Sequence, residues 1–297
     1  MRRFDCISTI SEKMLERVLI KTEGQAHCVL FPNWVDTNAI RPLEQPSPYR
    51  AELGIPESAI VLLYSGSMGE KQGLELILDA AHALRADPRY QFVMAGSGSA
   101  YHRLQQQAAQ ITNMRWLPLQ PAERLNAFLN LADIHLLPQK EDAADLVMPS
   151  KLTGMLASGR PVITTARPGT QVARVVECAG LVVEPSCLPC IVSAIRRLDD
   201  DAPGRRRLGA AARQCARDVL ERERVLRAYE DQLHDSLTAP PARTWGRACD
   251  PQPLGTRRPA QRPGSFLTSN FRAERRVADQ RVPPGHPTPA GAMTHGR

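Results

Sequence analysis

The sequence predicts an α/β protein built on a doubly wound parallel sheet, with further helices and a disordered tail at the C-terminus. Short, continuously apolar segments such as Ile60–Tyr64 are typical of strands that helices cover on both faces. These segments alternate with stretches of helical spacing such as Leu74–Leu84. Such alternation favours parallel strands joined by crossover helices, and ligands of such sheets bind beyond the carboxyl ends of the strands.

The first elements of the chain precede the regular alternation. Ser11 is a suitable N-cap for a helix, and Gly24 is a suitable stop for it. The predicted elements are a strand at Cys6–Ile10, a helix from Glu12 to about Thr22, a strand at His27–Phe31 and a loop at Asn33–Gln45.

From residue 59 the strands and helices alternate regularly. Pro121 suits the first turn of one helix, and Ser150 precedes another as an N-cap. The predicted strands are Ile60–Tyr64, Gln91–Ala95, Met114–Leu117, Ile134–Leu137, Val162–Thr164 and Gly180–Val183. The predicted helices are Leu74–Leu84, Tyr101–Ile111, Pro121–Leu131, a short one opened by Ser150, Gln171–Val176, Leu188–Arg197, Pro203–Val219 and Glu221–His234.

The basic charge of the chain lies in its C-terminal tail. The whole chain carries 38 Lys and Arg against 31 Asp and Glu. Ten of the arginines and three of the acidic residues follow residue 238. Residues 1–238 therefore carry 28 basic and 28 acidic side chains. The tail is also rich in proline, so it cannot bury enough apolar surface to offset its ordering entropy. We expect disorder there, and the charge does not indicate a nucleic-acid-binding fold.

The seven cysteines are scattered and do not form a disulfide framework. Cys187-Leu-Pro-Cys190 has CxxC spacing, but no second CxxC or histidine pair completes a zinc site. Packing at a helix start or coincidence explains it better than redox or metal chemistry. The sequence has no signal peptide and no apolar run long enough to span a membrane. We therefore expect a cytoplasmic protein, with peripheral association with the inner membrane left open.

The segment Asp145–Val162 holds the first candidate site. It predicts a loop, a helix opened by Ser150 and a strand. Lys151 lies in the first turn, where a cation opposes the helix dipole, and such a local conflict is expected where an anionic ligand balances the charge. An ordinary capped helix with a solvated lysine explains the same residues.

Two glycine-containing turns follow predicted strands at the same edge. The turn Gly66–Gly73 allows close backbone approach and carries Lys71, which suits a phosphate, although it is not a Walker loop. Gly96-Ser-Gly98 lacks the third glycine of a dinucleotide fingerprint, so a tight turn and a ligand-binding turn remain equally open. His135 lies inside an apolar strand and is better explained as a structural histidine than as a base.

Seven short motifs follow one another along the chain in a fixed order. They are Phe31-Pro-Asn-Trp-Val-Asp36, Tyr64-Ser-Gly-Ser-Met-Gly-Glu-Lys-Gln-Gly73, Ala95-Gly-Ser-Gly98, Leu117-Pro-Leu-Gln-Pro121, Ala132–Pro138, Pro149–Leu152 and Ala157–Val162. This ordered set resembles the C-terminal half of a GT-B glycosyltransferase of family 4, and is most similar to colanic acid biosynthesis and related exopolysaccharide enzymes. The resemblance covers about residues 4–237.

The resemblance implies a Rossmann-like half that holds the donor in a retaining transfer of a sugar from a nucleoside diphosphate sugar, without a metal or other cofactor. Cations and helix N-termini then stabilise the leaving diphosphate. Of the donor-binding residues that it implies, Gly66 and Ser67 would line the phosphates and backbone around Leu119 would meet the base. The segment Asp145, Met148 and Pro149 would meet the sugar, and Lys71, Ser150 and Lys151 would face the diphosphate.

The sequence also departs from the pattern of that family. Many relatives carry two glutamates eight positions apart, which here fall on Leu146 and Gly154, and the usual arginine and lysine of the glycine-rich turn fall on Ser67 and Gln72. No catalytic residue is therefore assigned. The function expected is sugar transfer from a GDP- or UDP-sugar to an exopolysaccharide or lipid-linked acceptor at the membrane surface. The alternatives are a non-catalytic nucleotide-sugar-binding domain and a GT-B nucleotide-sugar epimerase.

The resemblance also gives a division of the chain. Residues 1–45 are expected to be the remnant of an N-terminal domain with a linker, 46–237 the donor-binding domain, and 238–297 the disordered Pro/Arg-rich tail. A GT-B enzyme needs an N-terminal half to hold the acceptor, so an N-terminally truncated enzyme with a separately encoded N-terminal half as partner is the expectation. Nucleic acid is not an expected partner.

Overall fold

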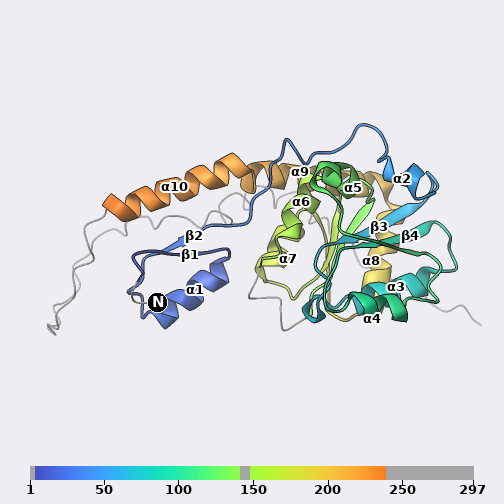
Figure 1. Ribbon diagram of the computed structural model, residues 1–297, viewed down its shortest axis with the longest axis horizontal. Helices are drawn as coiled ribbons and strands as arrows, with labels where there is room; N and C mark the ends of the chain where they lie inside the picture. The colour runs from blue at the N-terminus through green and yellow to red at the C-terminus, as the bar shows by residue number, and fades with distance from the viewer. Residues whose placement is uncertain (1–3, 141–147, 239–297) are drawn as a thin grey trace, which may run out of the picture. The chain divides into compact units, whose positions relative to one another are not determined.

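The computed structural model describes residues 4–140 and 148–238, with side chains to residue 236. Six strands form one sheet in which every neighbouring pair is parallel, in the order β5-β4-β3-β6-β7-β8 (Figure 1). The predicted doubly wound parallel sheet is thereby confirmed. The strands are β3 (Ile60–Ser65), β4 (Tyr90–Ala95), β5 (Met114–Leu117), β6 (Ile134–Leu137), β7 (Val162–Thr165) and β8 (Gly180–Val183).

The strand order reverses between β3 and β6. From β3 the chain adds β4 and β5 on one side, and it then returns to place β6, β7 and β8 on the other. The connections after β3 and β6 therefore leave the sheet in opposite directions, and the carboxyl ends of these two strands are the switch point of the sheet. This is the position at which a doubly wound sheet binds its ligand.

Strand β3 shows why the sheet needs helices on both faces. Its residues are almost all buried, and they alternate between two apolar clusters, as the two-residue period of a strand requires. Leu62 and Tyr64 pack with the cluster that contains residues of α3, α4 and α8, whereas Val61 and Leu63 pack with the cluster that contains Tyr49 of α2 and residues of α5. Figure 1 shows α3 and α4 on one side of the sheet and α5 and α2 on the other.

The helices of this domain follow the predicted alternation with local differences. The helix predicted over Pro121–Leu131 is divided into a 3₁₀ turn, η2 (Ala122–Arg124), and α5, because the Arg124 amide bonds three residues back to Pro121. Helix α4 is shorter than predicted, and α2 was not predicted. The helices are α2 (Tyr49–Glu52), α3 (Glu75–Leu84), α4 (Tyr101–Gln107), α5 (Leu125–Leu129), α6 (Lys151–Ala157), α7 (Gln171–Val176), α8 (Leu188–Asp200), α9 (Ala202–Val219) and α10 (Arg222–Thr238), with a 3₁₀ turn η1 (Glu70–Gln72).

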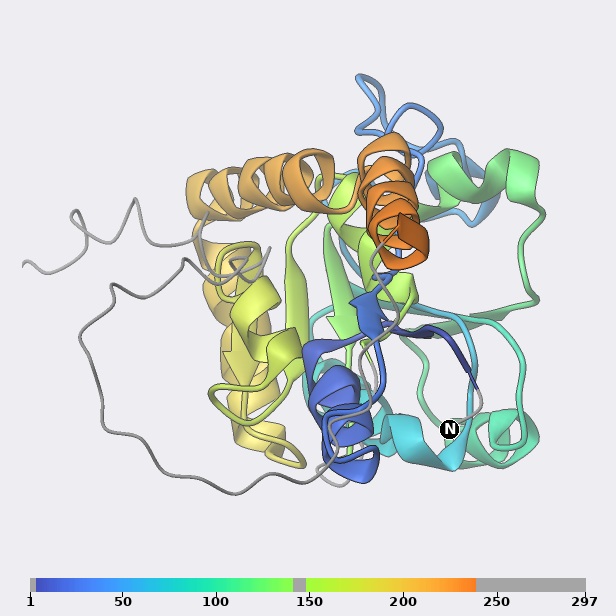
Figure 2. The ribbon, with the colours of Figure 1, turned by 90° about the vertical axis from the view of Figure 1, so that its left-hand side faces the viewer.

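The N-terminal elements form a small sheet of their own. Strands β1 (Ile7–Thr9) and β2 (Cys28–Leu30) pair in parallel, and α1 (Glu12–Lys21) connects them (Figure 2). Ser11 caps α1 through a 3.2 Å bond from the Met14 amide, as predicted. The chain then continues through a loop to α2.

The C-terminal helix α10 returns to these N-terminal elements. The rings of Phe31 and Tyr229 stack with centroids 4.1 Å apart, and the Gln232 side chain accepts a hydrogen bond from the Leu30 amide. The segment after β2 is therefore held by α10.

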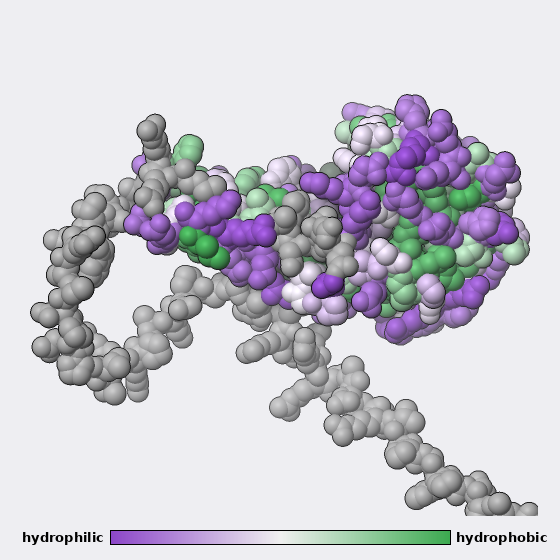
Figure 3. Space-filling model, turned by 90° about the horizontal axis from the view of Figure 1, so that it is seen from below, coloured by the Kyte–Doolittle hydropathy of each residue, from purple (hydrophilic) through white to green (hydrophobic). Residues whose placement is uncertain are grey.

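Two predicted features lie outside the described residues: the disorder expected of the tail, which concerns residues 239–297, and the role expected of Asp145. None of the helices in the described ranges is both long and apolar enough to cross a membrane. On the described surface, five large hydrophobic side chains are exposed among mainly hydrophilic ones, of which Figure 3 shows one face. They are Phe4, Ile20, Trp34, Leu119 and Leu125.

Candidate functional site

The candidate site lies at the β3/β6 switch point, where the turn after β3 meets the first residue of α6. Gly66 has φ 131°, a conformation that favours glycine. A Cβ built on Gly66 would lie 2.9 Å from Lys151 Cε and 3.0 Å from Lys151 Nζ. The lysine side chain therefore lies directly over the backbone of the turn, and the absence of a side chain at residue 66 makes this approach possible.

Tyr64 fixes the position of the Lys151 ammonium. Lys151 Nζ donates a 2.6 Å hydrogen bond to the Tyr64 hydroxyl and lies 4.3 Å from the centre of the Tyr64 ring. The Tyr64 hydroxyl in turn donates to the Ser67 carbonyl. This chain of bonds ties the start of α6 to the glycine-rich turn. Tyr64 was not predicted as a site residue, although its sequence signal is a polar tip near the end of an otherwise apolar strand.

Burial changes the electrostatics of this pair. It lowers the pKa of Lys151 to about 8, because a charged ammonium loses hydration there, and it raises the pKa of Tyr64 well above its ordinary value. Within residues 4–140 and 148–236, no carboxylate pairs with Lys151. Lys151 is thus a half-buried cation at a ligand edge without an anionic partner in the described part of the chain.

The two glycines of Gly96-Ser97-Gly98 are required by packing between turns. A Cβ on Gly96 would lie 1.9 Å from the Gly66 carbonyl oxygen, and one on Gly98 would lie 2.3 Å from the Met68 carbonyl oxygen. Backbone hydrogen bonds from Gly66 to Ala95 and from Met68 to Ser97 hold the two turns together. Of the two interpretations left open by the sequence, these contacts favour a tight turn that supports the Gly66 turn.

Ser150 stands at the predicted helix start, but the predicted side-chain cap is wrong. Its backbone is helical, with φ −60° and ψ −32°, whereas a capping serine needs an extended backbone to turn its oxygen back onto the helix. The Ser150 side chain makes no capping bond and is exposed. The Thr153 hydroxyl donates to the Ser150 carbonyl instead. The Ser150 hydroxyl is therefore available to a ligand at the start of α6.

Met148 and Pro149 lead directly into this helix. Met148 is buried, Pro149 is half-buried, and the Met148 carbonyl accepts a 2.9 Å hydrogen bond from Asn33 Nδ2. Asn33 lies in the segment after β2, so that segment anchors the residues before α6. This role of Asn33 was not predicted, although its motif was noted.

Three other predicted site residues lie at the same edge with exposed side chains. Ser67 lies in the turn, and Lys71 lies in η1, where its carbonyl accepts from the Lys140 amide. Leu119 is 70% exposed and follows β5, the outermost strand on that side. The structure thus brings Lys151 onto Gly66 and joins it through Tyr64 to Ser67, and it places Lys71 and Leu119 on the same edge without a described contact to Lys151.

His135 has the structural role expected from the sequence. It is fully buried in β6, and its Nε2 lies 3.1 Å from the Ser158 hydroxyl. Ser158 donates its hydrogen to the Met155 carbonyl, so Nε2 of His135 must be the donor in this pair. Burial, with a smaller effect of Arg160, lowers the pKa of His135 to about 3. The ring is neutral and links β6 to α6.

Gly154, one of the two positions where many relatives carry glutamate, lies in α6. A Cβ there would be 3.2 Å from Leu129 Cδ1 of α5. A larger side chain at this position would have to displace Leu129, so the local packing fits a small residue. The other position, Leu146, lies outside the described residues.

Within the described ranges, no group of three or more His, Cys, Asp or Glu side chains could hold a metal ion. The Cys187–Cys190 pair was expected to reflect coincidence or packing at a helix start, in preference to redox or metal chemistry. Cys187 is the N-cap of α8, but a disulfide joins the two cysteines, and that bond was not predicted.

Solved structures with a fold similar to this chain include Anabaena HepE and a sucrose-phosphate synthase. Anabaena HepE in complex with UDP and glucose aligns with a TM-score of 0.66 at 14% identity, over 78% of this chain and 64% of that one. Sucrose-phosphate synthase from Thermosynechococcus elongatus aligns with a TM-score of 0.62 at 20% identity, over 78% of this chain and 58% of that one. At these identities the likeness establishes the GT-B type of fold.

Sequence relatives point to the same family. WcaI of Escherichia coli (strain K12), named as a colanic acid biosynthesis glycosyl transferase, is 34% identical over 240 residues, which are 78% of this chain and 58% of WcaI. The chain therefore spans less than two thirds of that relative. The family model described as "Glycosyl transferases group 1" matches residues 47–215, more than half of the chain. With the fold and the glycine-rich edge described above, this match shows that the chain belongs to the group 1 family of glycosyl transferases.

Proposed function

We propose that this chain binds a nucleoside diphosphate sugar at the β3/β6 switch point and takes part in retaining, metal-independent transfer of the sugar to an exopolysaccharide or lipid-linked acceptor. The observation that carries the proposal is Lys151, a half-buried cation over the Gly66 backbone without a described carboxylate partner. Two phosphates at this position would supply the missing negative charge. The names of WcaI and of the HepE complexes, which contain UDP and glucose, are in keeping with this substrate class.

In this proposal several residues at the edge of the sheet contact the diphosphate together. Lys151 and the exposed Ser150 hydroxyl contact the diphosphate, and the close-packed turn at Gly66 and Ser67 lets its backbone approach the same group. Lys71 adds positive charge from the rim of the turn. As charge develops on the leaving diphosphate, Lys151 stabilises it without moving, because Tyr64 already holds the ammonium in place.

The remaining contacts would determine donor selection. Backbone near Leu119 would meet the base, and the segment with Asp145, Met148 and Pro149 would meet the sugar. Asn33 supports this segment through the Met148 carbonyl. We place the donor-binding domain at residues 46–237, which contains the region matched by the family model. The proposed partners are a lipid-linked acceptor at the membrane surface and a separately encoded N-terminal half.

Calorimetric titration of the full chain with UDP-glucose, UDP-N-acetylglucosamine, GDP-mannose and GDP-fucose tests the binding step. At least one donor should bind saturably, and Lys151→Met should weaken that binding at least about tenfold, as expected for the loss of a charged contact to phosphate. Lys71→Met, at the exposed rim, is the matched control and should have a smaller effect. The proposal would be contradicted if the folded protein bound none of the donors. It would also be contradicted if the Lys151→Met variant bound a donor as tightly as the unchanged protein.

Transfer itself needs a separate assay. Incubation with radiolabelled donor and membranes containing lipid-linked acceptors should give labelled lipid product. Binding without transfer would instead support a non-catalytic nucleotide-sugar-binding domain, and conversion of the free donor to an isomer would support an epimerase. The donor-binding proposal survives either of these results, whereas the transfer proposal does not.

A further inference from the structure

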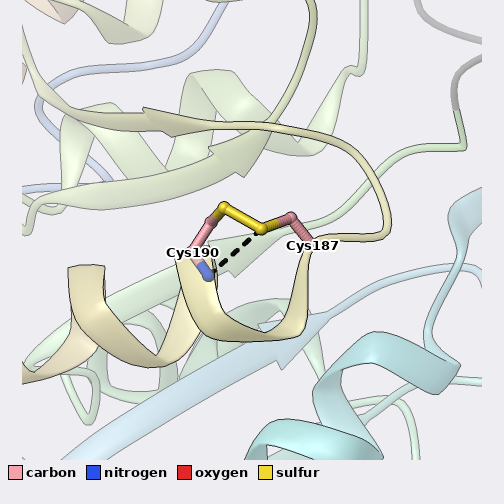
Figure 4. Close-up of a disulfide and its surroundings, with 2 residues drawn as sticks. All are labelled: Cys187 and Cys190. Carbon is pink, nitrogen blue, oxygen red and sulfur yellow. Dashed lines mark hydrogen bonds between the residues drawn. A yellow bond between two sulfur atoms is a disulfide. The ribbon is translucent and has the colours of Figure 1, made fainter.

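The Cys187–Cys190 pair lies outside the proposed donor site and has no role in it. A disulfide joins the two cysteines across the first turn of α8, and Figure 4 shows the bond together with the hydrogen bond inside the turn. Both residues are half-buried, so each remains partly accessible to solvent. Cys6, Cys28 and Cys215 are not part of a disulfide. The pair is therefore a specific local feature of this helix start.

The backbone brings the pair to the surface on the same edge as the candidate site. Strand β8 ends at Val183, and a short turn through Ser186 leads into α8. Ser186 has φ 59°, a left-handed conformation that reverses the chain before Cys187. A loop at the carboxyl end of a strand is a place where a reagent from solvent can arrive without unfolding the sheet.

The helix start makes the two sulfurs chemically unequal. Cys187 is the N-cap of α8, and its Sγ accepts a 3.3 Å hydrogen bond from the Cys190 amide. Helix α8 has 13 residues, so its N-terminal partial positive charge faces this sulfur. Both effects favour a thiolate at Cys187 over one at Cys190, whose own amide is the donor.

The disulfide is not required to hold α8 in place. Ile191, Ile195 and Leu198 anchor the helix in the main apolar cluster of the sheet. The ring that the disulfide closes spans a sequence separation of only 3, and such a short loop removes little entropy from the unfolded chain. Opening the bond should therefore leave the fold intact, which allows a reversible change.

We propose that Cys187 and Cys190 form a thiol–disulfide exchange site whose co-reactant is a dithiol. A thiolate of the dithiol attacks Cys190 Sγ, the Cys187–Cys190 bond breaks, and Cys187 leaves as the stabilised thiolate. In the mixed disulfide, the first sulfur of the reductant is bonded to Cys190 Sγ. The second thiol of the reductant then attacks that first sulfur, and Cys190 is released. Two electrons pass to the protein, and the dithiol becomes a cyclic disulfide. The two protons that the dithiol loses protonate the sulfurs of Cys187 and Cys190.

Differential alkylation of the native full chain tests accessibility. The air-oxidised chain is incubated with increasing concentrations of dithiothreitol, alkylated and digested with trypsin. Mass spectrometry then gives the mass of the peptide of residues 175–196. This peptide also contains Cys178, which serves as an internal thiol standard. We expect two additional alkylated sulfurs at reductant concentrations that leave the circular dichroism unchanged. Alkylation of both sulfurs before any reductant is added, or reduction only after unfolding, would overturn the proposal.

Two variants test the assignment of Cys187 as the reactive sulfur. Cys190→Ser leaves Cys187 with its amide partner, and Cys187→Ser leaves Cys190 while keeping an N-cap oxygen for α8. At pH 7 iodoacetamide should modify Cys187 in the first variant about tenfold faster than Cys190 in the second, because the Cys190 amide and the helix N-terminus stabilise the Cys187 thiolate. Equal rates in two folded variants would contradict the assignment.

Discussion

Lys151 lies with its ammonium 4.3 Å from the ring centre of Tyr64 and within 2.6 Å of the Tyr64 hydroxyl, which holds the cation over the backbone of Gly66. These contacts join the first residue of α6 to the carboxyl end of β3. They also cost stability, because the ammonium loses hydration without gaining a carboxylate among the described residues.

Replacement of Lys151 by methionine should stabilise the apo protein. Methionine is unbranched like lysine and only one atom shorter, so it keeps most of the apolar contacts of the side chain and removes a poorly hydrated charge. We therefore expect the free energy of unfolding to rise by about 1 kcal/mol. Urea denaturation without donor measures the change. The exposed variant Lys71→Met should be neutral within about 0.5 kcal/mol. A clear loss of stability in Lys151→Met would show that the ammonium contributes to the fold.

Donor binding should be linked to protonation of Lys151. The pKa of Lys151 is lowered to about 8 in the free protein, and a bound diphosphate should raise it again. The protonated form binds, so affinity is full below pH 8 and falls above it, by up to about tenfold per pH unit until the pKa of the complex is reached. Calorimetry at pH 8 in two buffers of different ionisation enthalpy should show uptake of about half a proton. Binding without proton uptake between pH 7.5 and 9 would refute this linkage.

An alanine at residue 66 should disturb the site more than the fold. Its Cβ would collide with the flexible end of Lys151 and not with backbone, so the lysine would shift, although the positive φ adds strain of about 1 kcal/mol. We expect donor binding to weaken at least about tenfold, with a melting temperature lowered by only a few degrees. Thermal unfolding and calorimetry on the same sample separate the two effects. Unchanged affinity would show that the approach of Lys151 to residue 66 is not needed for binding.

An alanine at residue 96 should damage the fold itself. The new Cβ would lie 1.9 Å from the Gly66 carbonyl oxygen, so two backbones would have to separate. We expect a loss of about 3 kcal/mol or more in the free energy of unfolding. Gly169→Ala is the matched control, because Gly169 also has a positive φ of 83° but no heavy atom near its Cβ, and its loss should be about 1 kcal/mol. Equal losses would show that backbone strain alone, and not contact between the turns, requires Gly96.

His135 should make the protein sensitive to acid. Its pKa is lowered to about 3 in the fold and is near 6.5 when unfolded, so the unfolded chain binds one more proton between these values. The contribution of His135 to stability is therefore full above about pH 6.5 and is lost by up to about 1.4 kcal/mol per pH unit as the pH falls towards 3. Between pH 4 and 6, the free energy of unfolding of His135→Gln should change less steeply with pH than that of the unchanged protein. The difference in slope should be about 1.4 kcal/mol per pH unit, which corresponds to one proton. Parallel curves for the two proteins would contradict a neutral buried histidine.

The sequence by itself determined most of the secondary structure and the edge of the sheet at which the candidate residues lie. Apolar runs such as Ile60–Tyr64 gave strands because both faces of a parallel sheet are buried, and the helical spacing of Leu74–Leu84 gave the crossover that follows. These are local patterns, and the structure confirms them. The sequence also placed Gly66 and Lys151 on the same edge, since both follow the carboxyl ends of predicted strands.

Only the tertiary structure decided which of these residues meet. The strand order puts β3 beside β6, and no local pattern specifies that pairing, because it depends on packing between segments distant in the chain. The contacts of Lys151 with Tyr64, of Gly96 with Gly66 and of Asn33 with Met148 all follow from it or from similar long-range packing. The backbone angles of Ser150 and the bond between Cys187 and Cys190 likewise depend on how each helix start is held in space.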